Sequence, residues 1–123
     1  IQYMLAGILG QLIKASAAHE HPLVSATRRY IADHLADRIT LKALADNADL
    51  SISHFTHKYH ELTGRAPMRD ARMQRLERAC VLINQTDLPL KTIARKVGVG
   101  DEFQLSRMLK RYLGLHVRDL RER

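Results

Sequence analysis

Apolar residues recur at helical spacing, every three or four positions, in several separate stretches of this 123-residue chain. The spacing predicts one amphipathic helix within residues 1–13, a second from Leu23 to Leu35, and a third from about Pro67 to Asn84. At about 1.5 Å per residue, the third helix would be a rod about 27 Å long. The chain is therefore expected to be all-α.

The hydrophobic pattern also contains a duplication. Residues 41–45, Leu-Lys-Ala-Leu-Ala, return 49 positions later as Leu-Lys-Thr-Ile-Ala at 90–94, and residues 55–57 return 50 positions later at 105–107. Each copy predicts a short helix, a tight turn and a second helix. This is the arrangement of a helix-turn-helix unit, and two such units are expected, one on each side of the long central helix.

In the first copy, Thr40 and Ser51 are expected to cap the two helices, because a hydroxyl can accept a hydrogen bond from a free backbone N–H of the first turn. Residues 46–50 would form the turn between these helices. The second helix would then turn one apolar stripe inward, made of Ile52, Phe55, Tyr59 and Leu62.

In the second copy, Pro89 can open the first helix, where a backbone N–H is not needed. Residues 98–100, Gly-Val-Gly, would form the turn, and Asp101 is the expected cap of the following helix. Its inward stripe would consist of Leu105, Met108, Leu109 and Tyr112.

The chain is thus predicted to have four parts. A first helix-turn-helix subdomain occupies 21–66, a linker helix 67–86, and a second helix-turn-helix subdomain 87–123. Residues 1–20 are interpreted as an extra N-terminal amphipathic helix and joint left from an upstream domain, because no capping residue precedes Ile1. This helix would pack on the body of the domain, or serve as a dimer helix or a contact with the upstream domain.

Charge points to a polyanionic partner. Lys and Arg number 20 against 13 acidic residues, which gives a net charge of +7. The chain has no Trp and only 5% aromatic residues, so it lacks the stacking platforms typical of single-strand binders, and duplex DNA is favoured. Residues 87–123 hold nine basic and five acidic side chains, whereas residues 39–66 hold three of each.

The outward positions of the two second helices are the candidate contacts with bases and phosphates. Arg107 could fork onto a guanine or act as a phosphate clamp, and Phe103 could touch a thymine methyl or belong to the core. The candidate base-reading residues are Ser53, Thr56, His57, Glu102, Phe103, Ser106 and Arg107. The candidate phosphate contacts are Thr40, Lys42, His60, Lys91, Lys110 and Arg111.

Other classes of protein find little support. The sequence has no phosphate-binding loop, no metal-ligand constellation and no nucleophile with an evident base, so we expect neither an enzyme nor a metal or cofactor. His19-Glu20-His21 is interpreted as a solvated loop. Cys80, the single cysteine, is expected to be a packed thiol. No stretch of eighteen apolar residues could cross a membrane.

The stretch from Ile39 to Arg121 resembles the C-terminal DNA-binding domain of AraC/XylS-type bacterial transcription regulators. The resemblance rests on several motifs in order: Leu41-x-x-Leu44-Ala45, Ser53-His54-Phe55, Thr63-Gly64-x-x-Pro67, Arg75-Leu76-x-x-Ala79, Asp87-Leu88, Ile93-Ala94, Val97-Gly98, Ser106-Arg107 and Lys110-Arg111. By position, the candidate base-reading residues match those of the family. Five residues depart from the family pattern, namely Asp70, Val99, Leu109, Val117 and Leu120.

The resemblance implies a sequence-specific, double-stranded DNA-binding domain of a bacterial transcription regulator that acts in the cytoplasm at the nucleoid. Activator is the expected type of regulator, although the choice between activation and repression depends on information outside the chain. Because the two units differ at their outward positions, they should read two adjacent major-groove segments of an asymmetric site. The resemblance also implies an upstream sensor or dimerisation domain, with RNA polymerase as a candidate partner. The alternative is a helical protein-interaction module with incidental basic charge.

Overall fold

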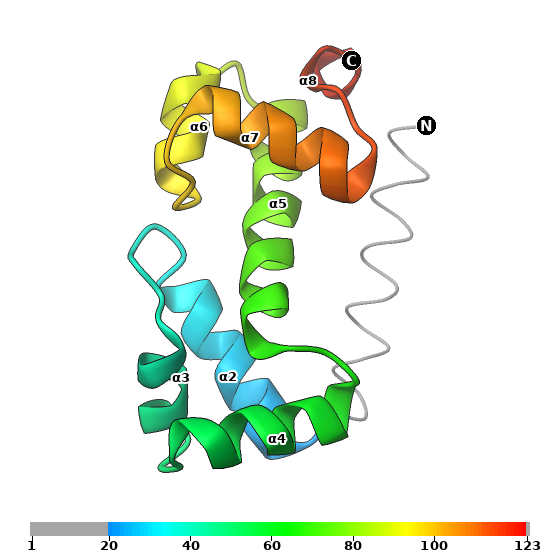
Figure 1. Cartoon of the computed structure of the whole chain (residues 1–123). Coiled ribbons are helices and arrows are strands. Elements are labelled where there is room, and N and C mark those ends of the chain that lie inside the picture. Colours follow the sequence, from blue (N-terminus) through cyan, green and yellow to red (C-terminus); the bar gives the residue numbers. More distant parts are fainter. Residues whose placement is uncertain (1–19, 123) are drawn as a thin grey trace.

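The computed structural model describes residues 20–122, and within them it shows helices and no strand. The helices are α2 (Pro22–Asp33), α3 (Leu41–Asn47), α4 (Ile52–Thr63), α5 (Pro67–Gln85), α6 (Leu90–Lys96), α7 (Glu102–Met108), the π-helical segment η1 (Leu109–Leu113) and α8 (Val117–Arg121). Helix α5 connects a group formed by α2, α3 and α4 at one end to a group formed by α6, α7 and α8 at the other (Figure 1). The predicted all-α fold with two helix-turn-helix units and a long central helix is confirmed, and the helix predicted within 1–13 lies outside the described residues.

The duplication extends to the backbone of the two turns. Leu50 N–H donates to Ala45 O at 3.0 Å in the first turn, and Val99 N–H donates to Ala94 O at 2.9 Å at the equivalent place in the second. The residue before each of these donors has a positive φ, +57° at Asp49 and +78° at Gly98. The two turns therefore reverse the chain in the same way.

The predicted caps are present. The side chains of Thr40, Ser51 and Asp101 accept hydrogen bonds from the backbone N–H groups three residues later, at 3.1, 3.1 and 2.7 Å. A similar bond was not expected at His21, whose Nδ1 accepts from the N–H of Leu23 and caps α2 at 3.1 Å. Residues 20 and 21 lie outside any helix and His21 is exposed, as expected for a solvated loop, whereas Glu20 is half-buried and pairs with Arg28.

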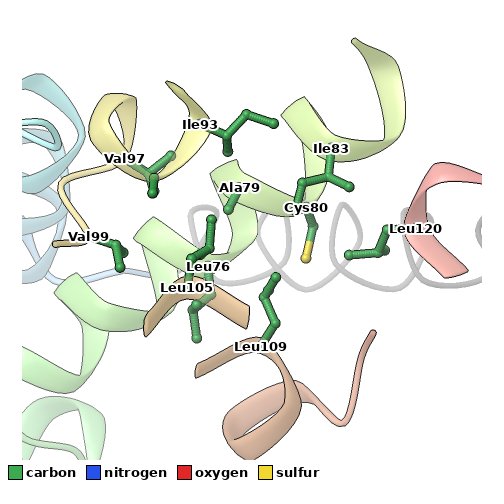
Figure 2. Close-up of a cluster of buried hydrophobic side chains, with 11 residues drawn as sticks. Leu76, Ala79, Cys80, Ile83, Ile93, Val97, Val99, Leu105, Leu109 and Leu120 are labelled. Carbon is green, nitrogen blue, oxygen red and sulfur yellow. The ribbon is translucent and has the colours of Figure 1, made fainter. Parts of the chain in front are cut away.

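Two hydrophobic cores flank α5. The first is built around Ile31, Leu44, Phe55 and Tyr59, and takes Ala71 from the first turns of α5. The second takes the rest of the buried face of α5, and Figure 2 shows how the side chains of α6, α7 and α8 converge on it. Its members labelled there are Leu76, Ala79, Cys80, Ile83, Ile93, Val97, Val99, Leu105, Leu109 and Leu120.

One predicted helix end and two predicted inward positions differ in the structure. Helix α2 ends at Asp33, so Leu35 lies beyond the helix, where it still packs against both cores. Ile52 is the first residue of α4 and is 44% exposed, and the buried face of this helix begins only at Phe55. Tyr112 lies in η1 and is 36% exposed, because the wider π turn rotates it away from the face that Leu105 and Leu109 bury.

Helix α8 repeats the start of α5 at a separation of 50 positions, and sequence analysis did not predict it. Leu120 is buried, as is Asp70 at the equivalent position of α5. Side-chain bonds hold α8 against the far end of α5, from Asn84 Nδ2 to Leu120 O at 3.0 Å and from Arg121 Nη1 to Thr86 O at 3.2 Å. The second core is closed by this short helix.

A buried carboxylate fixes α4 to α5. Asp70, on α5, is 5% exposed and accepts a hydrogen bond from the hydroxyl of Tyr59, on α4. Arg28 Nη2 lies 3.4 Å from Asp70 Oδ2, and Arg65 Nη1 lies 3.6 Å from Asp70 Oδ1. Burial, and then the bond to Asp70, raise the pKa of Tyr59 well above its usual range, so the hydroxyl stays a donor.

We predict that Asp70→Ala lowers the free energy of unfolding by about 1–3 kcal/mol, because it leaves the buried Tyr59 hydroxyl without its acceptor. Chemical denaturation measures this change. Arg65→Ala is the control: Arg65 is the more exposed partner, so its removal should cost no more than about 1 kcal/mol. Equal losses from both substitutions would contradict a structural role of the buried acceptor itself.

Burial, helped by Glu77 nearby, raises the pKa of the Cys80 thiol to about 11. The unfolded thiol ionises at lower pH than the folded one, so the stability gained from the neutral buried thiol is present below about pH 9 and is lost as pH rises through 11. We predict that the stability of the native chain relative to Cys80→Ala falls by about 1–3 kcal/mol between pH 7 and 11. Urea unfolding of both proteins across this range measures it, and a constant difference would contradict the prediction.

Candidate nucleic-acid interface

The second helix of each unit carries the candidate base-reading residues. In Figure 1, α4 and α7 lie at opposite ends of α5, and both run from left to right across the view. Each begins directly after a capped turn, at Ile52 and Glu102. The structure therefore carries the two helices in the same direction on one central helix.

On α4, two of the three candidate base-reading residues are exposed. Ser53 and His57 face solvent, and His57 Nε2 lies 4.0 Å from Glu61 Oε2. Thr56 differs from the prediction, because its Oγ1 is buried and has no hydrogen-bond partner among the described residues. Rotation about χ1 would be needed to bring this hydroxyl to the surface.

On α7, the candidates share one face. Phe103 is 66% exposed, which excludes the interpretation as a core residue. Arg107 is exposed, and Glu102 and Ser106 are half-buried. An exposed Phe beside an Arg is unusual for a plain solvated surface and suits contact with a partner.

Equivalent positions of α4 and α7, 50 residues apart, differ in chemistry. Ser53 corresponds to Phe103 and His57 corresponds to Arg107. One turn later, His60 corresponds to Lys110. The two helices thus present unlike side chains on the same scaffold, and Arg107 of α7 and Lys110 of η1 are cations where the first unit has His57 and His60.

The candidate phosphate contacts are exposed on both units. The six residues are Thr40, Lys42, His60, Lys91, Lys110 and Arg111. Two of them already have other contacts: the Thr40 hydroxyl oxygen accepts the capping bond, and Lys42 Nζ lies 2.8 Å from Asp46 Oδ2 in a surface ion pair. A pair this exposed contributes little stability, so a phosphate can replace the carboxylate at small cost.

Sequence analysis missed a basic groove beside α7. The groove has a volume of about 400 Å³ and is lined by Ser106, Arg107, Lys110, His116, Val117 and Arg118. His116 and Arg118 come from the segment that begins α8, after the chain reverses at Gly114 in a left-handed conformation. The duplication was the available signal, because α8 corresponds to the start of α5.

Residues 20–122 contain no group of three or more His, Cys, Asp or Glu side chains placed to hold a metal ion. Over the same residues, no helix has the length and apolarity that crossing a membrane requires.

A family model described as a helix-turn-helix domain matches residues 44–123, about two thirds of the chain. The MmsAB operon regulatory protein of Pseudomonas aeruginosa is 32% identical over 94 residues, which cover 76% of this chain and 31% of that protein. The arabinose operon regulatory protein of Escherichia coli K12 is 32% identical over 87 residues, covering 70% of this chain and 30% of that protein. The chain belongs to the AraC/XylS family.

Solved structures agree with this assignment. The DNA-binding domain of AdpA, a global transcriptional factor in complex with a target DNA, has a TM-score of 0.71 and 25% identity, and covers 81% of this chain and 89% of that one. The C-terminal domain of AraT, a response regulator from Geobacillus stearothermophilus, has a TM-score of 0.74 and 25% identity, and covers 82% of this chain and 84% of that one. The chain is thus a sequence-specific DNA-binding domain of a transcription regulator, and it spans about a third of the length of the curated relatives named above.

The departures from the family pattern fit the structure of this AraC/XylS-type domain. Val99, Leu109 and Leu120 are buried members of the second core. Val117 is the first residue of α8 and packs against the same core, and Asp70 is the buried acceptor of the Tyr59 hydroxyl. The residues present at these five positions are therefore accommodated by their surroundings.

We predict that Phe103→Ala changes the free energy of unfolding by less than about 0.5 kcal/mol, because the ring is mostly exposed, yet weakens binding to a duplex selected by this domain. Leu105→Ala, two residues further along α7 and fully buried, should cost about 2–5 kcal/mol of stability. Thermal unfolding and gel-shift titration of both variants check this. A large loss of stability from Phe103→Ala would contradict a surface role.

Proposed function

We propose that this domain reads two adjacent major-groove segments of one asymmetric duplex site, with α4 in one segment and α7 in the other. The observation that carries the proposal is that two equivalent helices with unlike outward side chains run in the same direction on a single central helix. Two recognition helices with identical outward side chains would favour a repeated DNA sequence, whereas two helices with unlike side chains favour an asymmetric one.

In this proposal Ser53, Thr56 and His57 contact bases from α4. Thr56 requires the rotation described above. From α7, Glu102, Phe103, Ser106 and Arg107 contact bases. Arg107 is suited to a bidentate bond with guanine O6 and N7, and Phe103 to apolar contact with a thymine methyl.

Phosphate contacts are proposed for Thr40, Lys42, His60, Lys91, Lys110 and Arg111. We add His116 and Arg118, because they line one groove with Lys110 beside α7. The net positive charge of residues 87–123 exceeds that of residues 39–66. Most of the counterion release should therefore accompany the binding of α7 and its surroundings to DNA.

The proposal extends to the whole regulator. We infer subdomains at 21–66 and 87–123, a linker helix at 67–86, and a sensor or dimerisation domain upstream of residues 1–20. RNA polymerase is a proposed further partner, and the proposed location is the cytoplasm, at the bacterial nucleoid. A domain that spans about a third of its curated relatives leaves length for such a partner domain in the full regulator.

We predict that Arg107→Ala costs about 1–3 kcal/mol of binding free energy and relaxes the preference at a single base pair, because one bidentate contact is lost. Selection from random duplexes, followed by titration of each single-base variant of the selected site, measures both effects.

Lys110→Ala, one helical turn further along, is the matched control. As a phosphate contact it should lower affinity evenly across sequences and reduce the slope of log K against log salt by about one. An even loss from Arg107→Ala, with no change in base preference, would contradict its role in reading a base.

A further inference from the structure

The two helix-turn-helix units touch each other directly, away from the axis of α5. The second turn, at Gly98, approaches the segment Leu35–Asp37 that follows α2. A Cβ added to Gly98 would lie 2.2 Å from the backbone oxygen of Leu35 and 2.9 Å from Nε of Arg75. Because Gly98 also has a φ of +78°, glycine is required here both for the turn and for the approach.

Arg75, on α5, donates hydrogen bonds to the backbone of the segment that Gly98 approaches. Its Nη2 donates to Asp37 O at 2.9 Å, and its Nε donates a longer bond to Leu35 O at 3.4 Å. The guanidinium is partly buried, which lowers its pKa, and the two carbonyl oxygens replace part of the hydration that it loses. The side chain thus ties the first unit to α5 at the point where the second unit arrives.

The apolar packing coincides with this polar contact. Leu35 packs against the second core, which holds Val97 and Val99 from either side of Gly98, and also against the first core. We name the contact of Gly98, Arg75 and the segment Leu35–Asp37 the junction. The junction combines the packing of Leu35 on both cores, the close approach of Gly98 to the backbone of Leu35, and the two hydrogen bonds of Arg75.

A single helix cannot by itself define how two attached units are oriented, because helices bend and the units can rock about their attachments. A second contact away from the helix axis removes much of that freedom. Each base pair inserted between two half-sites moves one groove segment by about 3.4 Å and turns it by about 35° around the duplex. A domain with a fixed orientation cannot follow such a change with both recognition helices.

We propose that the junction fixes the orientation of α7 relative to α4 and thereby sets the half-site spacing that the domain accepts. Arg75 and Gly98 are then positioning residues that determine spacing specificity without touching DNA. This inference rests on the proposed function, in which both helices enter grooves of one site.

The test uses the full 123-residue chain and a duplex that it selects from a random pool, with the protected segments located by footprinting. One or two base pairs are then inserted between the segments, and the ratio of affinities for the original and the inserted duplex is measured. For the native chain we expect the insertion to reduce affinity about tenfold or more. For Arg75→Ala and Gly98→Ala we expect weaker binding to the original duplex and a ratio that falls to about threefold or less.

Gly114→Ala is the matched control. Gly114 also has a positive φ, +65°, but a Cβ there would meet no atom within 4 Å, so the substitution brings similar backbone strain without disturbing the junction. It should keep the native ratio. Circular dichroism monitors folding, and if Gly98→Ala does not fold, Arg75→Ala decides alone.

The outcomes separate the two proposals. A native chain that discriminates against the inserted duplex, with Arg75→Ala and Gly98→Ala discriminating equally well, would overturn the junction while leaving two-groove reading intact. A native chain that binds both duplexes equally and protects one segment would overturn two-groove reading and the junction with it. A reduced ratio in Gly114→Ala as large as that in Gly98→Ala would also overturn the junction, because strain in any turn would then explain the result.

Discussion

The structure depends on the sharing of α5 between two hydrophobic cores. Each unit consists of short helices and is so small that the burial of its own apolar surface would barely offset the conformational entropy lost on folding. Helix α5 gives its first turns, with Ala71, to the first core and the face of Leu76, Ala79 and Ile83 to the second. Neither core closes without it, so the two units are held on one helix by the same burial that folds them.

This constraint has a direct consequence for recognition. The second helix of each unit is held in place by buried side chains, which are Phe55 and Tyr59 in α4 and Leu105 in α7. These side chains belong to the two cores that share α5. The exposed faces of α4 and α7 are therefore positioned by buried residues that never approach DNA. Chemistry on the exposed faces can vary while the buried repeat is kept, which is how equivalent positions come to hold His57 in one unit and Arg107 in the other.

Much of the fold could be predicted because it is local. The caps at Thr40, Ser51 and Asp101 and the Gly98 turn follow from the hydrogen-bonding and backbone preferences of those residues. Helix α5 ends within one residue of its predicted limit. The exposed position of Arg107 also follows from helical spacing, since the burial of Leu105 fixes the opposite face of α7. For Phe103 the sequence left a core position open, and the 66% exposure of its side chain decides against it.

The remaining features depend on contacts between distant segments, which spacing does not contain. The π-helical segment η1 departs from the 3.6-residue period on which the prediction rested, and this departure exposes Tyr112. Arg72 Cζ lies over the Tyr112 ring, 4.1 Å from its centroid. The bond between Tyr59 and Asp70, and the approach of Gly98 to Leu35, join residues whose proximity only the folded chain shows. The buried Oγ1 of Thr56 likewise depends on a rotamer and not on the helical face.

The central claim is that the relative placement of the two units is set before DNA binds. Its most direct test is double electron–electron resonance between spin labels at Asn47→Cys and Lys96→Cys, exposed and equivalent positions at the ends of α3 and α6, in a Cys80→Ala background. The account predicts one narrow distance distribution that is the same in the free chain and in its complex with a selected duplex. A broad distribution in the free chain that narrows only when DNA binds would contradict it.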